Sequence, residues 1–148
     1  MSTAGWIVDA SVAAKWFRPS SIEPDRELAE ELIAEGSIRT TSLCLFEIGN
    51  VLALKTLDND QQVAEKLAAL VRYCGTPIEL APADYARASE LARKHGITFY
   101  DASYVAIAER MGRRVVSADR DLLDPGLAVD LKTAVGGGRG PSGPGPSS

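Results

Sequence analysis

Cysteine and histidine are scarce in this chain of 148 residues. The two cysteines, Cys44 and Cys74, both fall in apolar stretches with helical patterning and have no metal-ligand spacing, which argues against a disulfide framework and a Cys/His metal site. We interpret them as buried thiols of a protein in a reducing compartment. The single histidine, His95, stands beside Gly96 at an expected helix end, so we interpret it as a helix C-terminal residue rather than a catalytic base.

The sequence also lacks long apolar runs. Its N-terminus, MSTAGWIVDA, has no cationic segment followed by a long apolar one. No stretch reaches the apolar length that a bilayer-spanning helix needs. We therefore expect a soluble, cytoplasmic protein with no membrane partner.

Positive charge is not in excess, because 16 Lys and Arg residues face 20 Asp and Glu residues, for a net charge of −4. This balance is unusual for a protein that binds nucleic acid by neutralising phosphates. The objection weakens if several carboxylates surround divalent cations, because the ions offset the acidic charge. Otherwise the composition, with 45% hydrophobic residues, is that of an ordinary globular domain.

Short apolar stretches alternate with longer amphipathic ones along the chain. We expect strands at residues 5–8, 38–41, 78–80, 114–117 and 128–131. We expect helices at residues 10–17, 24–35, 43–57, 60–73, 82–95 and 100–111. This alternation predicts an α/β fold with a mainly parallel central sheet flanked by helices.

The C-terminal segment differs in composition from the rest. From Gly136 onward the sequence reads GGGRGPSGPGPSS, in which every residue except Arg139 is Gly, Pro or Ser. Such a segment is typical of a flexible linker or tail. We therefore expect one folded domain at residues 1–133 and a flexible tail at residues 134–148.

Two aspartates follow expected strands. Asp9 comes directly after the first strand, and Asp119 comes shortly after the strand that contains Val115 and Val116. In open parallel sheets, sites form in the crevice beyond the carboxyl ends of the strands. Each residue also has an ordinary interpretation, Asp9 as a helix cap and Asp119 as a turn residue.

Two further acids interrupt the apolar faces of helices. Glu47 lies one turn from Cys44 and Val51, and Asp101 shares a face with Tyr104. Burying an unpaired carboxylate is costly, so each needs a proton, a basic partner or a metal. The alternatives are that Glu47 lies at the rim of the core and that Asp101 is a helix N-cap.

The four acids Asp9, Glu47, Asp101 and Asp119 can converge on one crevice of a parallel sheet. Their charges would then repel one another and raise their pKa values, a conflict that Mg²⁺ or Mn²⁺ removes. Such a site suits phosphodiester hydrolysis by metal-activated water. On this basis we expect Asp9→Ala or Asp101→Asn to abolish cleavage while leaving the fold intact or, without metal, more stable.

Several polar residues lie near these acids in the sequence. Ser11 and Ser117 stand two residues from Asp9 and Asp119, where each can orient the neighbouring carboxylate or a metal-bound water, or serve as an ordinary cap or turn serine. We interpret Asp121 as an outer member of the site. Lys15 and Arg18 can contact phosphates or form a solvated helix face.

Four segments, IVDASVAAKWF, SLCLFEIGNVL, TFYDASYVAIAER and VVSADRDLL, resemble the PIN-domain family and, within it, the VapC toxins. The resemblance runs from about Ile7 to Leu131. It implies a three-layer PIN-like fold. In this likeness Asp9, Glu47, Asp101 and Asp119 match the metal-binding acids, and Ser117 matches the Ser or Thr that precedes the last acid by two.

The resemblance further implies a Mg²⁺- or Mn²⁺-dependent endoribonuclease that cuts structured RNA such as tRNA or rRNA. It implies a homodimer that is silenced by a cognate VapB-like antitoxin encoded beside it. The Gly/Pro/Ser-rich tail is not part of the family pattern.

Other interpretations remain open within the same fold. One is an RNA-processing nuclease without an antitoxin, and another is a non-catalytic PIN-like binding module.

A phospho-accepting receiver domain, a different class of protein, would need an adjacent acidic pair after the first strand and a lysine after the last one. This chain has only Asp9 at the first position and no suitable lysine after Val116.

Overall fold

The computed structural model describes residues 5–139. Its centre is a four-stranded sheet with the strand order β2-β1-β3-β4. The strands are β1 (Trp6–Val8), β2 (Ile38–Arg39), β3 (Arg114–Val116) and β4 (Ala128–Val129). Every neighbouring pair is parallel, which confirms the expected parallel sheet.

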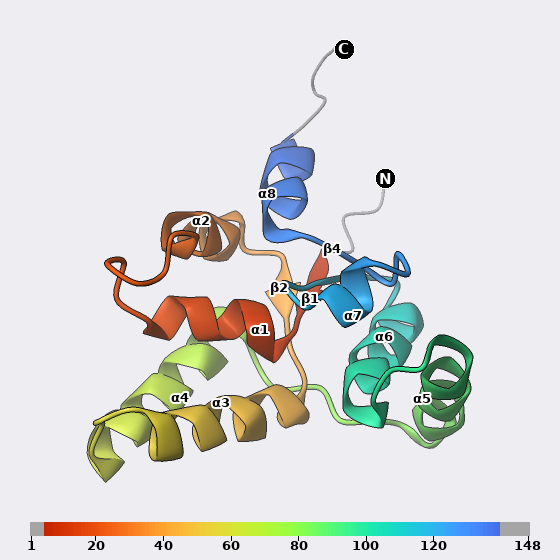
Figure 1. The fold of residues 1–148 in the computed structure, drawn as a ribbon, viewed down its shortest axis with the longest axis horizontal. Helices are drawn as coiled ribbons and strands as arrows, with labels where there is room; N and C mark the ends of the chain where they lie inside the picture. Colours follow the sequence, from red (N-terminus) through yellow and green to blue (C-terminus); the bar gives the residue numbers. More distant parts are fainter. Residues whose placement is uncertain (1–4, 140–148) are drawn as a thin grey trace.

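Helices connect and cover these strands, as parallel strand pairs require. They are α1 (Ala10–Ala13), the 3-10 helix η1 (Ala14–Phe17), α2 (Arg26–Glu35), α3 (Ser42–Lys55), α4 (Asp60–Cys74), α5 (Pro82–His95), α6 (Phe99–Met111), α7 (Arg120–Leu123) and α8 (Leu131–Arg139). The sheet lies between α2 and α8 above and the pairs α3–α4 and α5–α6 below (Figure 1). The expected α/β fold, with helices flanking the sheet, is confirmed.

Side chains at the helix starts explain several of these bounds. Asn59 Oδ1 accepts a hydrogen bond from the Gln62 amide at 2.9 Å, and Gln62 Oε1 accepts one from the Asn59 amide at 2.8 Å, which together cap α4. Thr41 and Thr98 cap α3 and α6 through their hydroxyls. These caps set where the helices that carry Glu47 and Asp101 begin.

Gly5 allows the chain to enter β1. Its φ of 80° lies in the left-handed region, and a Cβ at this position would lie 2.2 Å from the carbonyl oxygen of Ser37. Only glycine fits so close an approach. The approach sets β1 beside the start of β2, where Trp6 pairs with Ile38.

The core lies on both sides of β1 and β3. The side chains of Ile7, Val8, Val115 and Val116 are at most 1% exposed. The segment of α6 from Ala102 to Ala108 is buried throughout and lies against these strands. Because α6 is fixed in this way, its first turn is held at the edge of the sheet.

Two sequence expectations need correction. Residues 78–80 do not form a full strand, since Ile78 makes only an isolated bridge to Thr41. The expected domain end at residue 133 falls too early, because α8 continues to Arg139 and buries Ala134 and Val135 beside α2. The glycines after Val135 indicated a break, yet the apolar contacts of α8 offset their low helix propensity. Residues 140–148, the rest of the expected tail, lie outside the described part of the chain.

Within residues 5–139, none of the helices combines the length and the apolar character that crossing a membrane requires.

Candidate active site

The site lies at the carboxyl ends of the two central strands. Asp9 follows β1, and Ser117 to Asp119 follow β3. Because Val8 pairs with Val116, these two strand ends are adjacent, and the Asp9 amide donates to the Val116 carbonyl oxygen at 3.3 Å. The expected convergence of Asp9 and Asp119 thus follows from strand register.

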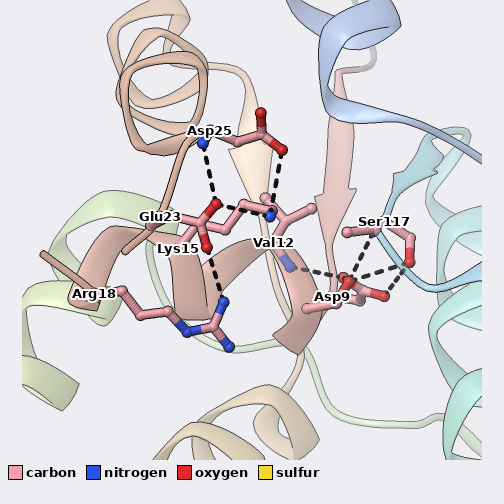
Figure 2. Close-up of polar contacts among 9 residues, drawn as sticks. Asp9, Val12, Lys15, Arg18, Glu23, Asp25 and Ser117 are labelled. Carbon is pink, nitrogen blue, oxygen red and sulfur yellow. Dashed lines mark hydrogen bonds and ion pairs between the residues drawn. The ribbon is translucent and has the colours of Figure 1, made fainter. Parts of the chain in front are cut away.

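Asp9 is buried, and both of its carboxylate oxygens accept hydrogen bonds (Figure 2). Its Oδ1 accepts from Ser11 Oγ at 2.6 Å and from the Val12 amide at 3.2 Å. Its Oδ2 accepts from Ser117 Oγ at 2.5 Å. The Val12 bond makes Asp9 the N-cap of α1, so the helix-cap interpretation is correct and coexists with a place in the acidic site.

The two serines connect Asp9 to the loop after β3. Ser11 Oγ accepts from the Ala118 amide at 2.8 Å, and Ser117 Oγ accepts from the Asp119 amide at 2.9 Å. Each hydroxyl proton is directed at Asp9, so the serines accept on one side and donate on the other. This arrangement fixes the backbone that presents Asp119.

Within residues 5–139, Asp101, Asp119 and Asp121 form a close acidic group. One carboxylate oxygen from each lies within 4.8 Å of the others. Asp121 joins the group because α7 starts directly after Asp119, whose Oδ1 accepts from the Asp121 amide at 2.9 Å. The sequence had indicated Asp121 only as an outer member of the site.

Asp9 and Glu47 are not part of this three-residue group. Glu47 is half-buried, and its Oε1 accepts from the Tyr104 hydroxyl at 2.6 Å. Asp101 is not the N-cap of α6, because Thr98 has that role and accepts from the Asp101 amide at 3.0 Å. The carboxyl group of Asp101 is therefore not needed for helix capping.

The carboxylates influence one another electrostatically. The pKa of Asp101 is raised to about 6, first by burial and then by the charges of Asp119, Asp9, Glu47 and Asp121. The pKa of Asp9 is also raised to about 6, mainly by burial, although the bonds from Ser11, Ser117 and Val12 lower it. The charges of Asp9, Glu47, Asp119 and Asp121 thus all act on Asp101.

The donor set fits a hard divalent cation. It consists of carboxylate and hydroxyl oxygens, which Mg²⁺ and Mn²⁺ prefer. Burial, and then the charges of Asp9 and Glu47, raise the pKa of the Cys44 thiol to about 12, so the thiol stays protonated and is a poor ligand. Such a cation would offset the repulsion among the neighbouring carboxylates.

The raised pKa values of Asp9 and Asp101 predict how the stability of the metal-free protein depends on pH. Between about pH 4 and about pH 6 the folded chain binds protons that the unfolded chain has released, so the free energy of unfolding falls as pH rises through this window. Urea unfolding in chelator at several pH values measures this slope. Asp101→Asn should reduce it, and an unchanged slope would contradict the assignment of Asp101.

Lys15 and Arg18 both contact the buried carboxylate of Glu23. Lys15 is buried, and its Nζ lies 3.1 Å from Glu23 Oε2 and 3.5 Å from Asp25 Oδ2 (Figure 2). Arg18 Nη1 donates to Glu23 Oε1 at 2.9 Å. The solvated helix face is therefore wrong for Lys15.

Sequence reasoning missed both Glu23 and the role of Tyr104. Tyr104 carried a signal, since it stands three residues after Asp101 on the same face of α6. Glu23 carried none, because it lies in a turn between η1 and α2 whose path depends on tertiary contacts.

Comparison with known proteins agrees with this geometry. The family model of the PIN domain matches residues 6–126. This chain belongs to the PIN-domain family. The matched range contains every acid of the site described above.

Individual relatives of this PIN domain place it among VapC-type proteins. Ribonuclease VapC3 of Pyrobaculum aerophilum is 32% identical over 123 residues, covering 80% of this chain and 92% of that protein. The crystal structure of PAE2754 from Pyrobaculum aerophilum matches with a TM-score of 0.67 and 25% identity, over 89% of this chain and 87% of the other. That of FitAcB from Neisseria gonorrhoeae matches with a TM-score of 0.63 and 21% identity, over 84% and 94%, and shows the shared fold.

Proposed function

We propose that this PIN domain is a metal-dependent endoribonuclease and the toxin of a VapBC-type toxin–antitoxin pair. The proposal rests mainly on the group Asp101, Asp119 and Asp121, which lies near buried Asp9 at the carboxyl ends of the central strands. The similarity to a protein named Ribonuclease VapC3 supports both the reaction and the biological role.

We assign Asp9, Glu47, Asp101 and Asp119 to binding of Mg²⁺ or Mn²⁺, and add Asp121 because of its position. A bound cation of this kind lowers the pKa of a coordinated water and neutralises charge on the phosphate. Ser11 and Ser117 hold both oxygens of Asp9 in place through bonds of 2.6 and 2.5 Å. Hydrolysis joins the water oxygen to phosphorus, breaks the bond to the leaving ribose oxygen and delivers a proton to that oxygen.

Tyr104→Phe tests whether the positioning of Glu47 matters. The change removes the hydroxyl that donates to Glu47 at 2.6 Å and leaves the ring in the core. Losing such a supporting bond typically weakens metal affinity about tenfold or more, so we expect the Mg²⁺ concentration for half-maximal cleavage to rise by a similar factor. Tyr85→Phe, at an exposed position on α5, is the matched control, and an equal effect of both changes would remove the role from Tyr104.

The toxin assignment predicts growth arrest when the chain is expressed alone. Co-expression of a small gene encoded beside it should restore growth, and RNA from arrested cells should contain new, defined ends that are absent with Asp101→Asn. Cleavage without arrest or rescue would favour an RNA-processing nuclease. The absence of both cleavage and arrest would favour a binding module.

The same proposal includes the partners that the family likeness implies. They are a tRNA or rRNA substrate, a VapB-like antitoxin and a second copy of the chain. Sequencing the RNA ends identifies the substrate, and light scattering of the purified protein measures whether it is a dimer.

A further inference from the structure

A pocket joins the acidic site to the end of η1. Its volume is about 320 Å³. Its wall includes Ser11 and Glu47 near the acidic site and Arg18, the residue directly after η1. Arg18 is the one cationic residue among the described residues of this wall. Arg18 and one acid of the site, Glu47, therefore line the same pocket.

Arg18 is held in place by a buried carboxylate. Its Nη1 donates to Glu23 Oε1 at 2.9 Å, and the side chain of Glu23 is only 4% exposed. Glu23 Oε2 in turn accepts from Lys15 Nζ and from the Asp25 amide, both at 3.1 Å. In Figure 2 the guanidinium group lies on the Asp9 side of its own backbone.

This contact leaves part of the guanidinium group free for a ligand. Its side chain is 45% exposed, and among residues 5–139 the one hydrogen bond of its guanidinium group is the Nη1 bond to Glu23. Lys15 already gives Glu23 a buried counter-charge. The remaining edge, Nε and Nη2, has the fork geometry that binds a phosphate with two hydrogen bonds.

The charge of the site creates a need for such a group. The chain carries a net charge of −4, and five acids gather around the site, so a bare phosphate backbone approaching it meets like charge. A cation held by these acids would neutralise charge at the reacting phosphate. A flanking phosphate needs a cation supplied by the protein.

We propose that Arg18 binds an RNA phosphate that flanks the cleaved one, and that Glu23 is its positioning residue. The proposal rests on the proposed nuclease function and adds a subsite to it. Arg18 thereby sets how the strand enters the site along the pocket between η1 and α3.

Binding of a labelled RNA oligonucleotide of mixed sequence tests the proposal by fluorescence anisotropy in chelator over a range of salt concentrations. The test protein is Arg18→Gln, which removes the charge and keeps a side chain able to donate to Glu23. Arg93→Gln, at an exposed position on α5 away from η1, makes the same charge change and is the control. We expect Arg18→Gln to weaken RNA binding about tenfold. It should also reduce the steepness of the plot of log binding constant against log salt concentration by about 0.7 to 1. Arg93→Gln should change neither quantity.

Cleavage kinetics separate this role from a structural one. Arg18→Gln should raise KM and leave kcat nearly unchanged. Arg18→Lys keeps the charge but lacks the forked pair of donors, so its KM should lie between those of the parent protein and Arg18→Gln. If the parent protein binds and cleaves RNA and Arg18→Gln matches Arg93→Gln, the Arg18 subsite is wrong while the nuclease function stands. If the parent protein neither binds nor cleaves RNA, both proposals fail.

Discussion

Asp101→Asn is expected to reduce metal-dependent RNA cleavage by a factor on the order of a thousand, equivalent to about 4 kcal/mol of transition-state stabilisation. The change removes one carboxylate from the group with Asp119 and Asp121 and keeps the shape of the side chain. Cleavage of labelled RNA at saturating Mg²⁺ or Mn²⁺ measures the loss. Glu65→Gln, an exposed acid of α4, is the control and should cleave like the parent protein.

The same variant should be more stable than the parent protein without metal. Asp101 has a raised pKa because burial and four neighbouring acids oppose its charge, so removing the charge relieves repulsion at neutral pH. Solvent screening at this half-buried position limits the gain in unfolding free energy to about 1 kcal/mol. A variant that loses activity because it unfolds would show the opposite change in urea unfolding.

Asp9→Ala should behave differently, which corrects the sequence expectation for that substitution. Asp9 caps α1 and accepts bonds from Ser11 and Ser117, so alanine removes the cap and leaves the half-buried hydroxyl of Ser11 and the buried hydroxyl of Ser117 without this acceptor. Losses of this kind cost about 1–3 kcal/mol and oppose the gain from removing a buried charge whose pKa is raised to about 6. Asp101 is therefore the better position for separating activity from stability.

Glu23→Ala is expected to have the largest effect on stability, a loss of about 3–5 kcal/mol in unfolding free energy. The change leaves Lys15, whose side chain is 11% exposed, without its closest counter-charge. It also removes the hydrogen bond and ion pair that Arg18 makes with Glu23. Burial alone would raise the pKa of Glu23, yet bonds from Arg18, the Asp25 amide and Lys15 lower it below its usual value, which shows how strongly the charged form is held.

A double variant provides the matched test of this explanation. Lys15→Met with Glu23→Leu removes both charges of the buried pair and should recover most of the stability that Glu23→Ala loses, since apolar replacements of a buried ion pair are often neutral. Urea unfolding at neutral pH gives the three free energies. A loss below about 1 kcal/mol in Glu23→Ala would show that the pair contributes as little as an exposed one.

The sheet and the positions of the acids were largely predictable from the sequence. The short apolar runs before Asp9 and before Asp119 marked two buried strands, and the parallel pairing of β1 with β3 makes their ends adjacent. Glu47 and Asp101 were recognisable because each interrupts an apolar helix face. Such strand ends and helix faces depend mainly on residues that are near one another in the sequence, so they are predictable from it.

Features that depend on tertiary contacts were not predictable in the same way. Asp121 joins Asp101 and Asp119 only because α7 starts where it does and α6 lies beside it. The sequence allowed Lys15 to be a solvated charge, but in the structure it is buried against Glu23, which lies in the turn before α2. The glycines at the end of α8 indicated a break, but burial of Ala134 and Val135 continues the helix.

The decisive experiment is cleavage of total cellular RNA by the purified protein with Mn²⁺, with Mg²⁺ or with chelator. We expect defined RNA fragments with either metal, none with chelator, and recovery when metal is restored. Asp101→Asn should produce none under any of these conditions. Cleavage that persists in chelator, or that Asp101→Asn retains in full, would contradict the claim that these acids form a metal-dependent nuclease site.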